Sequence, residues 1–214
     1  MSPHLVYFAH GEAAVTPAYA AALASVGDVD IVLVRLDGRS SVYAKLGEDL
    51  RDADGRILPA LRQRFPPPAP EEAYATTTLI TYSAGYALAR AILGGDADRD
   101  ALDAYIAIDS IHADLVDGAA DAAQLAGFVA FAESARDGDK TFWLGHSDVR
   151  TTGYASTTQV AARMLELTGG EGGGFVVRAF NVRTQDANEH RAALVEWGPG
   201  FVAEALISRL GPSS

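Results

Sequence analysis

Cysteine is absent from the sequence of 214 residues. A disulfide bond, a thiolate nucleophile and a zinc site with cysteine ligands are therefore excluded. The absence of cysteine also suits a reducing compartment. We expect a cytoplasmic protein, or an exported one whose signal segment has been removed.

Long apolar runs and basic residues are also scarce. No apolar run approaches the length of a signal sequence or a membrane span, and residues 4–9 already have the pattern of a strand. The chain has 17 basic and 28 acidic residues, which gives a formal net charge of -11. This charge argues against nucleic acids and anionic membranes as partners. We expect neither nucleic-acid binding nor membrane insertion.

Apolar residues that could form a core are abundant. Hydrophobic residues make up 49% of the chain and charged residues 21%. A chain of this length and composition buries a sizeable core. We expect one compact domain over residues 1–214.

Short apolar runs rich in Val, Ile and aromatic residues predict strands that are buried on both faces. They cover residues 4–9, 30–36, 77–82, 104–109, 141–146 and 175–180. Helices are expected at residues 16–25, 43–64, 84–94, 119–136, 155–168 and 190–209. This alternation predicts an α/β fold with a mainly parallel central sheet of about six strands and helices on both faces. Active sites of such sheets lie at the carboxyl ends of the strands.

Two segments interrupt the alternation. Residues 37–74 form a long connection whose proline run cannot be helical inside, and we interpret it as a candidate cover for the substrate cleft. Residues 169–174 are glycine-rich, but they follow a helix, precede a strand and lack the Lys-Ser/Thr ending of a phosphate loop. We interpret them as a helix-to-strand connector.

The most informative stretch is residues 76–93, where a β-branched run ends at Ser83 and an alanine-rich helix begins. Its TYSAG pattern is one residue away from G-x-S-x-G, in which a sharp strand-to-helix turn exposes a nucleophilic serine. Thr81 stands where glycine is usual, so the turn must be more open or Thr81 must point into a local gap. An ordinary serine N-cap of a core helix is the alternative.

Polar residues follow the carboxyl ends of the expected strands. They are His10-Gly11-Glu12, Ser83, Asp109-Ser110-Ile111-His112, His146-Ser147-Asp148 and, after the last strand, His190. A serine hydroxyl needs a base to take its proton, and the base needs a carboxylate that fixes its tautomer. The chain order of Ser83, an aspartate and His190 meets both needs.

In these features the chain resembles the α/β-hydrolase superfamily. The resemblance covers nearly the whole length: His-Gly after the first central strand, a nucleophile turn, an acid after a later strand and a histidine after the last one. It implies a serine hydrolase that acts on an ester or a related acyl bond.

The resemblance also implies roles for individual residues. His190 stands where the base belongs, although it could instead be a polar residue in the first turn of a helix. The loop after the first strand matches the loop that completes the oxyanion hole. The amides of Gly11 or Glu12, with that of Ala84, would then receive the developing negative charge.

Two aspartates compete for the role of the acid. Asp148 lies three residues after Gly145, which resembles the Gly-x-x-Asp turn that carries the acid in most of the superfamily. Asp109 ends an apolar strand, where a carboxylate is costly to bury without a partner, and a minority of the superfamily places its acid there. The chain order fits both.

Several histidines and tyrosines near these groups are candidates for the substrate pocket. They are His10, Tyr82, Tyr86, His112 and His146. Core packing is the alternative for the aromatic rings. A zinc site built from the histidines His10, His112 and His146 with the aspartates is another alternative, but their spacing matches no HxxxH or HxxEH pattern.

We therefore predict a serine hydrolase, a carboxylesterase with little or no lid, that acts on a small-molecule or polymeric acyl ester and needs no cofactor or metal. An amidase, peptidase or thioesterase could use the same residues. A non-catalytic binding module on the same fold is the alternative from another functional class.

Overall fold

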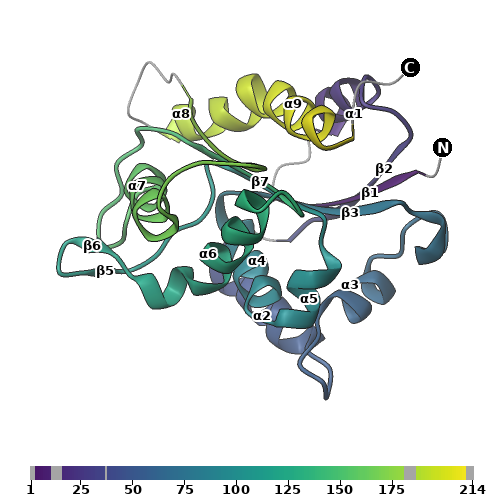
Figure 1. The fold of residues 1–214 in the computed structure, drawn as a ribbon, viewed down its shortest axis with the longest axis horizontal. Coiled ribbons are helices and arrows are strands. Elements are labelled where there is room, and N and C mark those ends of the chain that lie inside the picture. Colours follow the sequence, from purple (N-terminus) through teal and green to yellow (C-terminus); the bar gives the residue numbers. More distant parts are fainter. Residues whose placement is uncertain (1–2, 11–15, 37, 181–186, 211–214) are drawn as a thin grey trace.

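The computed structural model describes residues 3–10, 16–36, 38–180 and 187–210. Its centre is a parallel sheet of six strands in the order β2-β1-β3-β4-β7-β8 (Figure 1). The strands are β1 (His4–Ala9), β2 (Val29–Val34), β3 (Thr76–Tyr82), β4 (Ala104–Ile108), β7 (Thr141–His146) and β8 (Phe175–Ala179). The sheet confirms the predicted fold class, and each strand end lies within two residues of its predicted position.

Helices cover both faces of the sheet (Figure 1). One face carries α1 (Thr16–Leu23), α8 (Ala187–Ala192) and α9 (Gly198–Leu210). The other face carries α2 (Ser40–Leu50), α3 (Leu58–Arg64), α4 (Tyr86–Leu93), α5 (Asp96–Ala101), α6 (Ala122–Arg136) and α7 (Thr157–Thr168). This two-sided cover explains why the central strands are apolar at successive positions.

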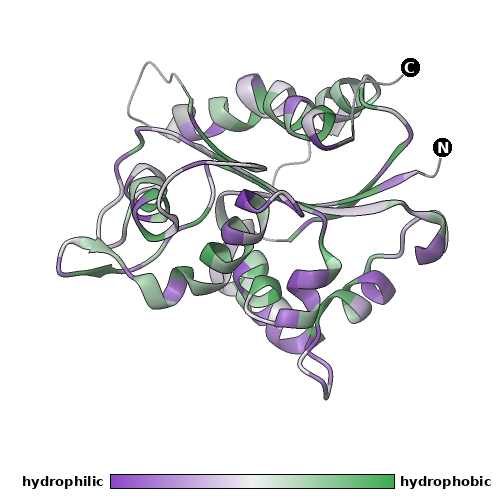
Figure 2. Cartoon of the chain, viewed as in Figure 1, coloured by the Kyte–Doolittle hydropathy of each residue, from purple (hydrophilic) through white to green (hydrophobic). Residues whose placement is uncertain are grey.

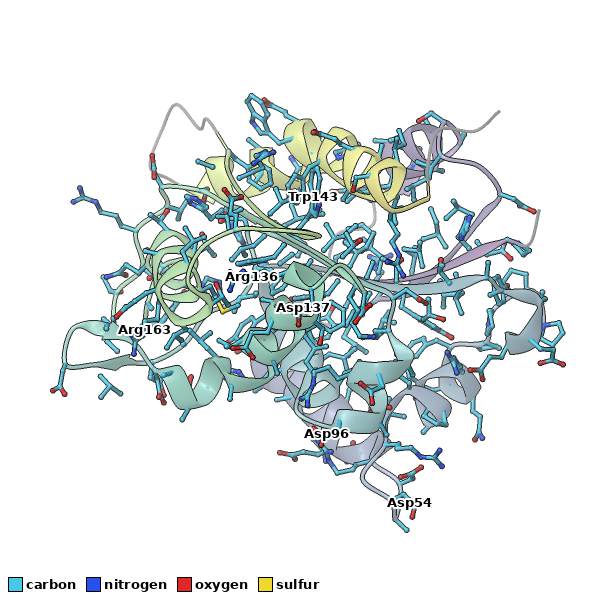
Figure 3. All side chains as sticks on the ribbon, in the orientation of Figure 1. Asp54, Asp96, Arg136, Asp137, Trp143 and Arg163 are labelled. Atoms are coloured by element: carbon cyan, nitrogen blue, oxygen red, sulfur yellow. The ribbon has the colours of Figure 1, made fainter. Side chains whose placement is uncertain are left out.

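The alternation of side chains along the strands divides the core into two layers. Tyr7 and Tyr105 belong to the layer under α2–α7, whereas Phe8 belongs to the layer under α1 and α9. In that second layer the ring of Trp143, labelled in Figure 3, lies 5.4 Å from the ring of Phe201 in α9. Hydrophilic residues gather instead at the edge of the molecule around α2 and α5 (Figure 2).

Several predicted helices differ from the observed ones. The expected helix at residues 43–64 is divided into α2 and α3, because the Asp52 carboxylate accepts the amides of Asp54 and Arg56 and closes a turn. Figure 3 labels Asp54 at the tip of this turn. Helix α5 was missed. The expected helix at residues 190–209 consists of α8, a π-helical segment (Ala193–Trp197) and α9.

A small hairpin, β5 (Leu115–Val116) with β6 (Ala119–Ala120), was also missed. Its turn is Asp117-Gly118, and both residues have positive φ, at 52° and 82°. This is the dipeptide that tight hairpin turns favour. Helix α6 consequently begins later than predicted, after Asp121, whose side chain accepts the amide of Ala123.

The glycine-rich segment connects α7 to β8, as predicted. Gly169 ends α7 in the left-handed conformation, with φ of 75°. Gly173 lies so close to α6 that an added Cβ would be 2.2 Å from the carbonyl oxygen of Arg136. Glycine is therefore required at this position by packing, which accounts for part of the glycine-rich sequence without a phosphate ligand.

A buried carboxylate joins α5 to the start of α3. Asp98 is 1% exposed, and its oxygens accept the amides of Ile57 and Leu58 at 2.6 and 3.1 Å. These two amides lie at a helix N-terminus, where the first N–H groups have no partner within the helix. Asp98 therefore satisfies two buried donors from a distant part of the chain.

We expect Asp98→Ala to lower the free energy of unfolding by about 3 kcal/mol, because two buried N–H groups lose a charged acceptor. Urea denaturation of the purified variants measures this change. Asp100→Asn, an exposed position in the same helix, is the matched control and should remain close to the parent. An Asp98→Ala variant as stable as Asp100→Asn would contradict the assignment.

Candidate active site

The strand-to-helix turn predicted at Ser83 is present. Ser83 follows β3 directly, has φ of 50°, and begins a 3-10 turn (Ser83–Gly85) that leads into α4. A left-handed conformation is strained for a residue other than glycine and is often found at functional sites. Behind the serine, a Cβ added to Gly85 would lie 2.4 Å from the carbonyl oxygen of Ala9. The turn thus packs tightly against the end of β1, and only glycine fits there.

Thr81 points into a polar gap between β3 and β4. Its hydroxyl donates to Ser110 Oγ at 3.0 Å, and Ser110 Oγ donates to the carbonyl oxygen of Ser83 at 3.0 Å. The Thr81 hydroxyl also lies 2.8 Å from Tyr105 Oη. Since the Thr81 proton is already used, Tyr105 must be the donor. A chain of hydrogen bonds therefore runs from Tyr105 through Thr81 and Ser110 to the backbone of Ser83, and it explains how threonine is tolerated at this position.

Asp109 lies at the end of β4, the strand beside β3. It is 1% exposed and has φ of 42°. Its carboxylate accepts the amide and hydroxyl of Ser147, at 2.9 and 2.6 Å, and the hydroxyl of Thr157, at 2.5 Å. His190 Nδ1 lies 2.6 Å from the same carboxylate. Four protein donors thus contact this carboxylate and offset the cost of burying its charge.

These contacts lower the pKa of Asp109 and orient the ring of His190. Burial alone would raise the pKa of Asp109, but the hydrogen bonds from His190, Ser147 and Thr157 outweigh it and hold this pKa below its usual range. A carboxylate that accepts from Nδ1–H leaves the lone pair of His190 on Nε2. His190 is therefore held in the tautomer that can act as a base through Nε2.

Tyr82 positions His190 from the other side. The two rings are stacked, with centroids 4.7 Å apart and planes inclined by 25°, and Tyr82 Oη donates to the carbonyl oxygen of His190 at 2.9 Å. The π-helical segment follows three residues later, and the Leu194 carbonyl within it accepts a hydrogen bond from Tyr19 Oη at 2.9 Å. Such segments are rare and recur at functional sites.

Two cavities meet at Ser83. One, of about 430 Å³, is also lined by Asp109 and His190, and we name it the His190 cavity. The other, of about 360 Å³, is also lined by Ala84 and Arg90, and we name it the Arg90 cavity. Both cavities include His112 and Tyr154 in their walls.

The other predicted residues lie in different surroundings. Asp148 is exposed and lines a separate cavity of about 550 Å³. His146 Nδ1 lies 3.0 Å from Thr158 Oγ1. Gly11 and Glu12 lie outside the described residues.

The rings of His10 and His112 both contact aromatic side chains. His10 is fully buried with its ring centroid 4.4 Å from that of Phe8, and burial lowers its pKa to about 4. His112 lies between Tyr86 and Tyr154, with edge-on ring contacts of 5.2 and 5.1 Å, and burial lowers its pKa as well. Of the two, His112 is the one that faces the cavities.

The histidines and aspartates of the alternative zinc site do not form a cluster among the described residues. In the part of the chain that the structure describes, no group of three His, Asp or Glu side chains comes together as a metal site would require. Over the same residues, no helix has the length and apolar character needed to cross a membrane.

From the sequence, no role was assigned to the four residues that support the site, and two of them, Thr157 and Tyr105, were not named. Ser147 and Thr157 bind Asp109, and Ser110 and Tyr105 hold the turn at Ser83. The only signal in the sequence was that Ser110 and Ser147 directly follow strands. Thr157 and Tyr105 give no such signal, because their partners are distant in the sequence.

No protein-family model matches the sequence, and no curated protein matches it. Solved structures are similar to it at low sequence identity. The IroE-like serine hydrolase from Shewanella oneidensis aligns over 95% of this chain and 70% of its own, at 15% identity and a TM-score of 0.54. The esterase Pf2001 from Pyrococcus furiosus aligns over 97% and 83%, at 14% identity and a TM-score of 0.52.

An uncharacterized protein from Bacillus cereus aligns over 99% of this chain and 60% of its own, at 14% identity and a TM-score of 0.54. These likenesses, together with the observed sheet order, establish that the chain has the α/β-hydrolase fold. The resemblance found in the sequence is thereby confirmed at the level of the fold.

We expect Thr81→Val to lower the free energy of unfolding by about 1–3 kcal/mol, because Tyr105 loses a buried acceptor and Ser110 a buried donor. Thr81→Ser, which keeps the hydroxyl, should lose less. Chemical denaturation measures both.

Thr77→Val is the matched control for this prediction. Thr77 is buried on the same strand and face, but among the described residues its hydroxyl accepts only a long hydrogen bond from Arg62, at 3.4 Å. If Thr81→Val and Thr77→Val lowered the free energy of unfolding equally, the chain of hydrogen bonds through Thr81 would add no measurable stability.

Proposed function

We propose that this protein is a serine hydrolase of the carboxylesterase type, with Ser83 as nucleophile, His190 as base and Asp109 as acid. The observation that carries the proposal is the 2.6 Å contact between His190 Nδ1 and Asp109, beside a cavity that Ser83 also lines. The fold supports it, since the similar structures include a serine hydrolase and an esterase.

The chemistry begins at Ser83 Oγ, which attacks the carbonyl carbon of the ester. His190 Nε2 takes the proton of the hydroxyl and then gives it to the leaving alkoxide as the carbon–oxygen bond breaks. Water attacks the resulting acyl-enzyme by the same route and releases the acid. Ser83 and His190 make no direct hydrogen bond in the described residues, and this contact often tightens only when substrate binds.

The negative charge that develops on the carbonyl oxygen requires N–H donors. We assign one to Ala84, whose amide lies in the turn that begins α4. The second is assigned to the loop after β1, at Gly11 or Glu12, which stays a prediction. The tight packing of Gly85 against Ala9 supports this, because it holds the end of β1 beside the turn.

We assign the acid to Asp109 rather than Asp148. Asp109 is buried and contacts His190, whereas Asp148 is exposed and lines another cavity. The desolvated carboxylate fixes the tautomer of His190 and stabilises the imidazolium that forms during attack. We also retain the proposal that residues 37–74 cover part of the cleft, supported by Gly38 and Ser40 in the wall of the Arg90 cavity.

A fluorophosphonate probe should label the protein at Ser83, because an activated serine attacks phosphorus as it attacks an ester carbonyl. Intact mass and peptide mapping give the stoichiometry and the position. Ser83→Ala should not be labelled. A protein that is folded but unlabelled at neutral pH would favour the non-catalytic binding module.

Asp109→Asn should reduce kcat for a 4-nitrophenyl ester by about 10⁴-fold, since it favours the wrong tautomer of His190. Asp148→Asn is the matched control and should retain activity within a few-fold of the parent. Circular dichroism establishes that each variant is folded. If Asp148→Asn caused the large loss and Asp109→Asn did not, the acid role would belong to Asp148.

A further inference from the structure

The two cavities beside Ser83 have different roles in the proposed reaction. The leaving group must lie next to His190, because this residue returns the proton to the departing oxygen. His190 lines only one of the two cavities that meet at Ser83. The Arg90 cavity, which includes Ala84 of the oxyanion hole, is therefore the place for the acyl part of the substrate.

Arg90 is the cationic group in this acyl cavity. It lies one helical turn after Tyr86 on α4, with its guanidinium 5.1 Å from the centre of the Tyr86 ring. Nη2 donates to the carbonyl oxygen of His112. Within the described residues, Arg90 forms no ion pair with a carboxylate, and its Nε has no hydrogen-bond partner. A guanidinium has five N–H donors. One N–H of Nη2 is used by His112 and Nε is buried, so the donors that remain for a ligand are the second N–H of Nη2 and the two of Nη1.

The lining of the same cavity also includes a carboxylate. Asp114 is exposed and accepts a hydrogen bond from Gln124 Nε2 at 2.6 Å. Arg90 is less exposed than Asp114. The cation is thus the more desolvated of the two charges, and it interacts more strongly with a bound ion than the exposed carboxylate does.

We propose that the Arg90 cavity binds an acyl group that ends in a carboxylate, so that the substrate is a monoester of a short dicarboxylic acid. This inference rests on the proposed function. Arg90 pairs with the distal carboxylate, and guanidinium–carboxylate pairs are strong and directional. Hydrolysis breaks the bond between the acyl carbon and the leaving oxygen, consumes one water, and releases an alcohol and the dicarboxylate.

The test compares two esters with acyl chains of equal length, 4-nitrophenyl hydrogen glutarate and 4-nitrophenyl pentanoate. The spontaneous release of nitrophenolate from each ester is measured without protein at the assay pH and subtracted, because the free carboxylate of the glutarate ester also attacks its own acyl carbon. The glutarate-to-pentanoate ratio of kcat/KM is then compared between variants, which share the same intrinsic ester reactivities. We expect the parent protein to prefer the glutarate ester. Arg90→Gln should lower the glutarate-to-pentanoate ratio about tenfold, mainly through KM, and Arg90→Lys should restore part of it.

Two further variants make the result specific. Asp114→Asn should raise the ratio, since it removes a like charge from the cavity. Arg64→Gln removes a positive charge from an exposed position on α3 and should leave the ratio unchanged. A fall in the ratio for Arg64→Gln as large as for Arg90→Gln would show only a general effect of net charge and would overturn the proposal.

The outcomes separate this inference from the proposed function. Hydrolysis of pentanoate without a preference for glutarate would overturn the carboxylate site and leave the serine hydrolase intact. Absence of both turnover and labelling at Ser83 would overturn both. Binding of glutarate monomethyl ester to Ser83→Ala, measured by calorimetry, adds a readout without turnover, and it should weaken about tenfold in the Ser83→Ala, Arg90→Gln double variant.

Discussion

The buried carboxylate of Asp109 is the interaction on which the site depends. A charge removed from water must find donors within the protein, and Asp109 takes them from three elements: the end of β7, the start of α7, and α8. The loss of one donor would leave part of a buried charge unsatisfied. The hydrogen bonds to Asp109 offset the cost of burying its charge. The bond from His190 among them also fixes the position of that ring and selects its tautomer.

Because β3 and β4 are neighbours, the loop after β4 also contacts the turn at Ser83. Asp109 binds His190, and the next residue, Ser110, donates to the backbone of Ser83. Positive φ angles occur at Ser83, Asp109 and Ile111, at 50°, 42° and 75°. Each is costly for a residue other than glycine. The hydrogen bonds between the two loops offset this strain, so the turn at Ser83 and the loop that carries Asp109 hold each other in place.

The parts that could be predicted from the sequence are those with local signals. Strands buried on both faces give continuous apolar runs, and the serine turn has its own pattern. The sequence did not show which aspartate contacts His190, because the Gly-x-x-Asp pattern at Asp148 is local, whereas the contact of Asp109 with His190 joins residues 81 positions apart. The reason why threonine fits at position 81 could not be predicted either. Its hydroxyl contacts Tyr105, which lies on another strand.

Asp109 and Arg90, two charged residues of the cleft, differ in how many of their hydrogen bonds are made within the protein. Asp109 receives four close donor contacts from protein groups, so it has little capacity left for a substrate and serves His190. Among the described residues, Arg90 has one protein acceptor and a contact with the Tyr86 ring, so the second N–H of Nη2 and those of Nη1 remain for a ligand. In a protein of net charge -11, an anionic group enters such a cleft only where a local cation outweighs the general repulsion. Half-buried Arg90 attracts an anion that lies within a few ångströms. The repulsion from distant acidic residues is weaker, because salt screens it.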